Sequence, residues 1–206
     1  MPEPGRQIAA TRIALLELKD EQRLVQEGYS LLDEKRILLA HEIQRQLAHL
    51  AALRREWAAL ESEARARTMA ALGRHGLDEL SVYPPMSLAA DRVVMRRSRL
   101  LGLELLDARL ETSPASPGRE QPVNPTPEAR ACAKAHRNWL LGAVERATCE
   151  LNLRRLVADY VRTERRAKAI ENVLMPEIES SLKLVEEQLE AIDQEEIARL
   201  RPPPRE

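Results

Sequence analysis

The chain has 206 residues, of which 44% are apolar, 32% are charged and only 2% are aromatic, with no phenylalanine at all. A compact enzyme of this length normally has many more large rings in its core, so this composition instead favours long helices packed through narrow aliphatic seams. The formal net charge of −1, from 32 basic and 33 acidic residues, argues against a nucleic-acid-binding protein and against a disordered chain.

The first predicted element is a long helix. Proline breaks helices, and the chain has no proline between residues 6 and 72. A seven-residue repeat runs through this stretch, which is typical of a coiled coil. One repeat position holds Leu18, Val25, Leu32, Leu39, Leu53 and Leu60, with Gln46 as the exception, and a second holds Ile43, Leu50 and Trp57. Gly73 and Gly76 predict the end of the helix, so residues 1–76 form the first segment.

Residues 77–126 are a different kind of segment, which we expect to form a small knob and loop. Seven of the 13 prolines lie between Pro84 and Pro127. The apolar residues between these prolines favour a short β-hairpin with strands near 92–97 and 103–110. An amphipathic helix stays an alternative, because Leu and Ala are not strong strand formers. Residues 111–126 are expected to form a loop.

A second long helix is predicted over residues 127–206, which end in a proline-rich tail. Thr126 followed by Pro127 is typical of a helix start. A seven-residue repeat passes through Leu153, Tyr160, Ala167 and Leu174, and then shifts by four residues to Ile178, Val185 and Ile192. We interpret this shift as a stutter in the coiled coil, and we expect Pro176 to bend the helix there.

Neither helix can bury its apolar stripe alone, and at 1.5 Å per residue each is on the order of 100 Å long. The predicted fold is therefore mainly α, a long antiparallel two-helix coiled coil with a small middle segment for which a β-hairpin is favoured. No apolar run reaches the length of about 18 residues that a membrane span needs, and no signal peptide is recognisable. Two cysteines suggest free thiols in a reducing cytoplasm.

No constellation for catalysis, for a cofactor or for a metal is recognisable. Cys132 and His136 are four residues apart, but two ligands do not complete a zinc site. Trp57 and Trp139 are interpreted as fillers of the helix seam. Charge is uneven: residues 154–168 hold six basic side chains, and residues 171–198 hold nine acidic ones against Lys183. This pattern is either a solvated face, partly neutralised by the facing helix, or a match to opposite charge on a partner.

Residues 163–176 carry a recognisable motif. They resemble the C-terminal helix signature of the D subunit of V-type and archaeal-type ATPases. The positions that agree with this signature are Thr163, Arg165, Arg166, Ala169, Glu171 and Pro176, whereas Ala167 and Lys168 depart from the usual Val and Asn. The N-terminal helix is similar to that family at Thr11, Arg12, Leu15, Leu16, Leu18, Lys19, Gly28, Leu31, Leu32, Lys35 and Arg36. Asp33 stands where Lys is common, and Ala10 where Pro is common.

The resemblance implies a non-enzymatic central shaft of a rotary ATPase, peripheral to the membrane on its cytoplasmic side. It implies that the termini lie inside a hexamer of catalytic and non-catalytic subunits. The middle segment would then bind the F subunit, as well as the funnel-shaped adaptor of the rotor ring. The residues expected to bind partners are Arg162, Thr163, Arg165, Arg166, Glu171, Pro176, Arg12, Lys19, Lys35 and Arg36. The alternatives are a coiled-coil adaptor or secretion-apparatus stalk, and an enzyme with its site in residues 77–123.

Overall fold

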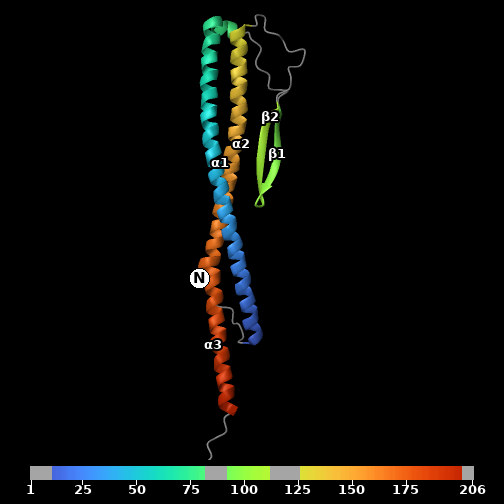
Figure 1. Cartoon of the computed structure of the whole chain (residues 1–206), viewed down its shortest axis with the longest axis vertical. Helices are drawn as coiled ribbons and strands as arrows, with labels where there is room; N and C mark the ends of the chain where they lie inside the picture. The colour runs from blue at the N-terminus through green and yellow to red at the C-terminus, as the bar shows by residue number, and fades with distance from the viewer. Residues whose placement is uncertain (1–10, 82–91, 112–125, 201–206) are drawn as a thin grey trace, which may run out of the picture. The chain divides into compact units, whose positions relative to one another are not determined.

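The computed structural model describes residues 11–81, 92–111 and 126–200, which are coloured in Figure 1. The chain forms two compact units, the first from residues 1–38 and 160–206 and the second from residues 39–159. Its elements in chain order are α1 (Arg12–Ser81), β1 (Arg92–Leu100), β2 (Leu103–Glu111), α2 (Pro127–Ala169), the π-helical turn η1 (Ile170–Leu174) and α3 (Met175–Leu200).

The predicted fold class is confirmed: the protein is mainly α, and in each unit a part of α1 runs antiparallel to a part of the C-terminal helices, with a small hairpin between them in sequence. Within the middle segment, the described residues 92–111 form the hairpin and not the alternative helix. None of the helices in the described ranges combines the length and the apolar character that crossing a bilayer requires.

The core of the first unit lies between α1 and α3. Thr11 caps α1, because its hydroxyl accepts a hydrogen bond from the backbone N–H of Ala14 at 3.1 Å. The cluster is aliphatic, and it consists of the buried Leu18, Ile178, Leu182 and Val185, with Leu15, Val25 and Leu189 packed against them. Leu18 and Val25 come from the repeat position that was predicted to face the partner helix. Each such side chain stabilises the pair by about 1.5–3 kcal/mol when fully buried.

The predicted shift of the repeat to Ile178 and Val185 is confirmed, since both side chains are buried, but it takes place through a π-helical turn and not through a stutter of α-helical turns. Met175 N–H donates to the carbonyl of Ile170, five residues back, so η1 holds one residue more than an α-helical turn would. Leu174, which was assigned to the seam, is 37% exposed, and Ile192 is 45% exposed. The inward positions instead run Thr163, Ala167, Ile170, Met175, Ile178, Leu182 and Val185. The single step of five residues in this series is the step across η1.

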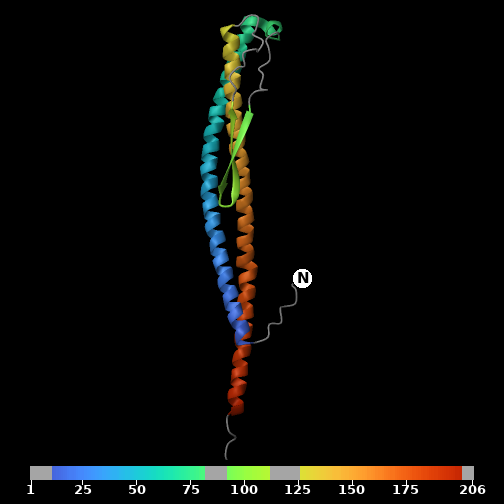
Figure 2. The same cartoon turned by 90° about the vertical axis from the view of Figure 1, so that its right-hand side faces the viewer.

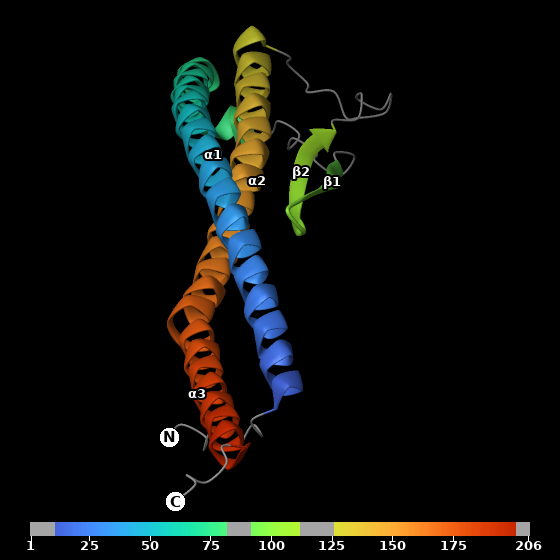
Figure 3. The ribbon, with the colours of Figure 1, turned by 60° about the horizontal axis from the view of Figure 1, so that its bottom comes forward.

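Pro176 gives a local reason for the wide turn. Proline has no N–H, and in an α-helix its ring would collide with the carbonyl four residues earlier, here that of Asn172. A wider turn moves that carbonyl away and needs no bond from Pro176. What lies next to Pro176 is thus a widened turn between α2 and α3, which can be followed in Figure 3, and the bend expected there stays a prediction.

The core of the second unit contains both tryptophans. Leu50 and Leu53 of α1 pack against Cys149 and Leu153 of α2. Trp57 and Trp139 lie with their ring centroids 5.6 Å apart, as expected for side chains that fill the seam. The two helices come close at Gly142, where a Cβ atom would lie 3.1 Å from a Leu60 methyl group. The absence of a side chain at this position makes room for Leu60.

A charged network spans the same seam beside the rings. The carboxylate of Glu150 on α2 accepts hydrogen bonds from Arg146 at 3.1 Å and from Arg54 of α1 at 3.3 Å. The guanidinium of Arg146 also lies 4.7 Å from the centre of the Trp57 ring, a cation–π contact. The hydrogen bond from Arg146, aided by Arg54, lowers the pKa of Glu150. This carboxylate therefore joins the two helices.

The helix ends next to the middle segment are held together by side chains. The predicted start of α2 is confirmed, because the Thr126 hydroxyl accepts a hydrogen bond from Ala129 N–H at 3.4 Å. The same hydroxyl is bonded to Nε2 of the buried His75 on α1. Gly76 has a φ of 71° and interrupts α1, which resumes for one short stretch to Ser81. The helix break thus lies at one of the two predicted glycines.

The hairpin is docked on α2 through β2. The side-chain amide of Asn152 accepts from Leu106 N–H at 2.9 Å and donates to Leu106 C=O at 2.6 Å, and Arg155 donates to Glu104 C=O at 3.0 Å. The turn consists of Leu101 and Gly102, both with positive φ, which matches the twist of a two-residue hairpin. Figures 1 and 2 show β2 beside α2 and β1 on its far side.

Glu150→Gln is expected to lower the unfolding midpoint at neutral pH, because it removes the carboxylate shared by Arg54 and Arg146. A lowered pKa in the folded state stabilises the fold above the carboxyl's ordinary pKa, and this stabilisation is lost as the pH falls through the lowered value. Thermal melts from neutral to acidic pH should therefore show a difference between wild type and variant that shrinks on acidification. Glu56→Gln, an exposed change on α1, is the matched control; a neutral-pH midpoint no lower than that of the control contradicts the prediction.

Deletion of Val173 combined with Pro176→Ala is expected to leave the first unit folded, with η1 converted into an ordinary α-helical turn. The deletion removes the extra residue of η1, so Ile178, Leu182 and Val185 keep their inward positions. Deletion of both Asn172 and Val173 with Pro176→Ala is the control, since each residue turns a helix by about 100° and the second deletion turns Ile178, Leu182 and Val185 together away from α1. Urea unfolding should show a large loss of stability for the control alone. A similar loss for both would contradict the role given to η1.

Candidate partner-binding surface

All ten residues predicted to bind partners lie in the first unit. Four are on α1, four near the end of α2, one in η1 and one at the start of α3. The unit thus brings together two stretches of sequence more than a hundred residues apart. Around these residues the unit also has acidic and exposed apolar side chains.

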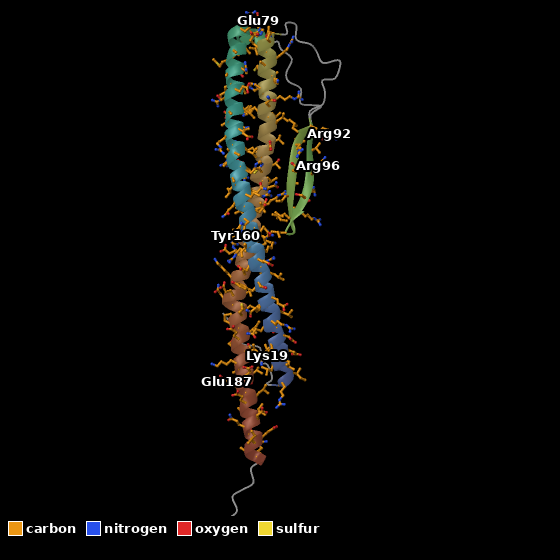
Figure 4. The ribbon with its side chains drawn as sticks, viewed as in Figure 1. Lys19, Glu79, Arg92, Arg96, Tyr160 and Glu187 are labelled. Atoms are coloured by element: carbon orange, nitrogen blue, oxygen red, sulfur yellow. The ribbon has the colours of Figure 1, made fainter. Side chains whose placement is uncertain are left out.

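The acidic face of α3 is partly neutralised by α1. Lys19 Nζ lies 2.9 Å from the carboxylate of Glu186, and Arg12 lies 3.4 Å from that of Asp193. Figure 4 shows Lys19 on α1 beside α3. All four side chains are about half exposed or more, so each pair contributes about 0–1 kcal/mol. Neutralisation by the facing helix, one of the two interpretations of the charge pattern, is thus observed for these two acidic residues.

Lys35 and Arg36 lie on α1 near the end of the unit and are half-buried. Arg36 forms a 2.6 Å ion pair with Asp33, one turn earlier on the same helix. Asp33 is the position at which the chain departs from the family's usual Lys. The departure therefore places a carboxylate beside Arg36, and the pair lowers the net positive charge that this part of α1 presents.

The end of α2 separates its residues into two faces. Thr163 and Ala167 are 3% and 2% exposed, so they pack inward and their side chains present no surface to a partner. Arg165 and Arg166 point outward, and within the part of the chain that the structure describes neither forms an ion pair. Arg162 is exposed as well. Glu164, by contrast, lies 2.9 Å from Lys168, whose hydrogen bond lowers the pKa of the carboxyl.

Glu171 and Pro176 lie in and directly after the π-helical turn, and both are exposed. No residue of η1 is buried. Val173 and Leu174 are exposed beside Glu171, so the wide turn presents an acidic and an apolar surface together. This combination results from the extra residue, which moves Leu174 out of the seam.

One feature that the sequence interpretation did not assign to partner binding is an apolar stripe on the outer side of α1. Its members are 49–70% exposed, and they are Ile13, Leu16, Leu24, Leu31, Ile37 and Leu38. Leu24, Leu31 and Leu38 follow one another at seven-residue spacing. This spacing indicates a second apolar helix face, and it can be recognised in the sequence alone. Large aliphatic side chains exposed in a row are typical of protein-interaction surfaces.

The arrangement is suited to protein contact. Among the described residues, no group of three or more His, Cys, Asp or Glu side chains is placed to hold a metal ion. Cys132 lies near Nδ1 of His136, at 3.7 Å, and near the Thr68 hydroxyl, at 3.6 Å. Both cysteines are free thiols, and burial raises the pKa of Cys149. The first unit has both exposed guanidinium groups, on α2, and exposed aliphatic side chains, on α1.

Comparison with known proteins gives the same family as the motif at residues 163–176. The family model for the D subunit of ATP synthase matches residues 14–202, which include both helical stretches and the hairpin. The chain belongs to the family of ATP synthase D subunits. The match extends well beyond the two helices on which the sequence resemblance was based.

Individual members of the family align over nearly their whole length. The chain is 27% identical to the D subunit of the A-type ATP synthase of Pyrococcus abyssi, over 98% of this chain and 94% of that protein. It is 26% identical to its V-type counterpart from Thermotoga neapolitana, over 94% and 95%. It is 29% identical to the V-type counterpart from Anaeromyxobacter dehalogenans, over 94% and 93%. Family membership therefore concerns the whole chain.

Proposed function

We propose that this chain is the central rotor shaft of a V/A-type ATPase. It transmits torque between ATP turnover in a catalytic hexamer and the membrane ring that translocates ions, and it has no catalytic site of its own. The observation that carries the proposal is the match to the family of ATP synthase D subunits over residues 14–202. The coiled-coil adaptor or secretion-apparatus stalk does not account for that match.

The physical character of the first unit supports this proposal. A shaft that turns inside a hexamer needs contacts that form and break at each step. Exposed ion pairs contribute about 0–1 kcal/mol each, so they release easily. Arg165 and Arg166 are exposed and carry full charge outward, and we propose that with Arg162 they contact the inner wall of the hexamer. Thr163 acts only indirectly, by packing the helix that positions these arginines.

We also propose a division of work along the sequence. The helices of segments 1–76 and 127–206 carry torque, and their ends lie in the hexamer of catalytic and non-catalytic subunits. Segment 77–126 belongs to the part that binds the F subunit, together with the funnel-shaped rotor-ring adaptor. The working place of the protein is the cytoplasmic side of the membrane, peripheral to it, as part of the complex.

The test is reconstitution of the complex with an Arg165→Glu/Arg166→Glu variant. Reversal of both charges should lower coupled ATPase activity about tenfold, equivalent to about 1.4 kcal/mol of lost interaction. The variant's own unfolding midpoint should stay within error of the wild type, because both side chains are exposed and unpaired in the described structure. Arg55→Glu, an equivalent change at an exposed position of the second unit, is the matched control. Equal activities of the two variants would exclude this contact.

A second test concerns the π-helical turn as part of the shaft. The variant that lacks Val173 and carries Pro176→Ala is expected to lose the π-helical turn η1. We expect fewer ions to be moved per ATP hydrolysed by the reconstituted complex, because the variant loses the acidic and apolar surface that the wide turn presents at Glu171, Val173 and Leu174. Pro176→Ala alone keeps the extra residue and should have a smaller effect. Unchanged coupling in both variants speaks against a role of η1 in torque transmission.

A further inference from the structure

The two outer edges of the hairpin differ in whether their backbone N–H and C=O groups have hydrogen-bond partners. In an antiparallel ladder, residues alternate between those whose backbone groups point to the paired strand and those whose groups point away. Because the turn after Leu100 has only two residues, Leu100 and Leu103 form a hydrogen-bonded pair. The backbone groups of Glu104, the next residue of β2, therefore point away from β1, and those of Leu106 do so as well. These are the residues whose backbone groups are bonded to Arg155 and Asn152 of α2. The outer edge of β2 is therefore occupied.

The outer edge of β1 is open. By the same alternation, the backbone N–H and C=O groups of Val93, Met95, Arg97 and Arg99 point away from β2. The sheet of the described structure has only these two strands, so no third strand pairs with these groups. The Val93 and Met95 side chains are 52% and 63% exposed. An open edge of nine residues is a template for another strand.

The open strand is strongly basic. Four of its nine residues are arginine and none is acidic. Arg97 is paired with Glu104 at 3.3 Å, whereas Arg92, Arg96 and Arg99 form no ion pair with any residue that the structure describes. Figure 4 labels Arg92 and Arg96 on β1. They share one face of the strand with Val94, while Val93 and Met95 share the other.

We propose that the β1 edge binds an extended acidic segment of another protein, which adds to the hairpin as a third strand. Main-chain hydrogen bonds to the outward groups of β1 supply affinity, and side chains at alternate positions supply specificity. A segment in which acidic and aliphatic residues alternate fits best. Its carboxylates then lie beside Arg92 and Arg96, and its aliphatic side chains lie beside Val93 and Met95.

The charge of β1 decides between this occupant and a second copy of the chain. Two β1 strands paired with each other would bring arginines next to arginines, and like charges on neighbouring strands are destabilising. An acidic strand instead gains ion pairs with arginines that have none in the described structure. A two-stranded hairpin is marginal by itself, so a third strand also stabilises the sheet.

The probe is a capped synthetic peptide of about eight residues in which Glu and Val alternate, about the length of a typical strand. It is titrated into the purified full chain and followed by fluorescence anisotropy. The matched control peptide has Lys in place of Glu. We expect the acidic peptide to bind at least about tenfold more tightly than the basic one, with affinity falling as salt screens the charges. Amide exchange should slow at Val93, Met95, Arg97 and Arg99.

Two variants locate the binding. Met95→Pro removes an outward N–H and leaves the β1–β2 ladder intact, because proline is tolerated on the free side of an edge strand. Arg96→Glu reverses a charge without touching the backbone, so it decides the question if the proline variant does not fold. Both should weaken binding about tenfold, whereas Arg55→Glu on α1 should not.

Three results would overturn the proposal. The first is equal binding of the acidic and the basic peptide, or binding of neither. The second is binding that Arg96→Glu leaves unchanged, or amide protection confined to residues outside β1. The third is a chain that sediments as a dimer and loses that dimer in Met95→Pro, since the edge would then pair with a second copy.

Discussion

The whole structure depends on one constraint: the apolar side chains of α1 and of the helices paired with it must face each other along a narrow aliphatic seam. No helix of this chain can bury its apolar stripe alone, so each segment of α1 depends on the helix that runs against it. In the first unit the seam is made of Leu18, Ile178, Leu182 and Val185, side chains without rings. In the second unit it also holds the paired rings of Trp57 and Trp139, and Gly142 leaves room there for Leu60. The absence of phenylalanine from the sequence agrees with an interface of this width.

Much of the fold could be predicted because it depends on local signals. The seven-residue repeat at Leu18 and Val25, the cap at Thr126 and the break near Gly76 each follow from residues close in sequence. The π-helical turn could not be predicted in the same way. Leu174 continues the repeat through Tyr160 and Ala167, so spacing alone favours it, and only packing against α1 shows that Met175 takes the inward place. A one-residue insertion and a four-residue stutter are similar in sequence but differ in which side chains they bury.

The candidate surface was predictable to a similar degree. That Arg165 and Arg166 are exposed follows from their position between the inward Thr163 and Ala167, which are four residues apart. The burial of Thr163 itself was missed, because a motif shows which residues belong together and not which of them face outward. The pairing of Arg36 with Asp33 depends on a departure from the family pattern and was likewise not predicted. The occupied edge of β2 needs residues 46 positions apart to meet, which no local signal reports.

The hydrogen bond between His75 and Thr126 has a consequence for how this protein can vary. The two residues are 51 positions apart, yet they fix the last turns of α1 to the first turn of α2. Whatever lies between them leaves and returns at a single place, so its length has no effect on how the helices are aligned. Its length can therefore change without a shift in how the paired helices align, provided that β2 keeps its hydrogen bonds to Asn152 and Arg155 of α2.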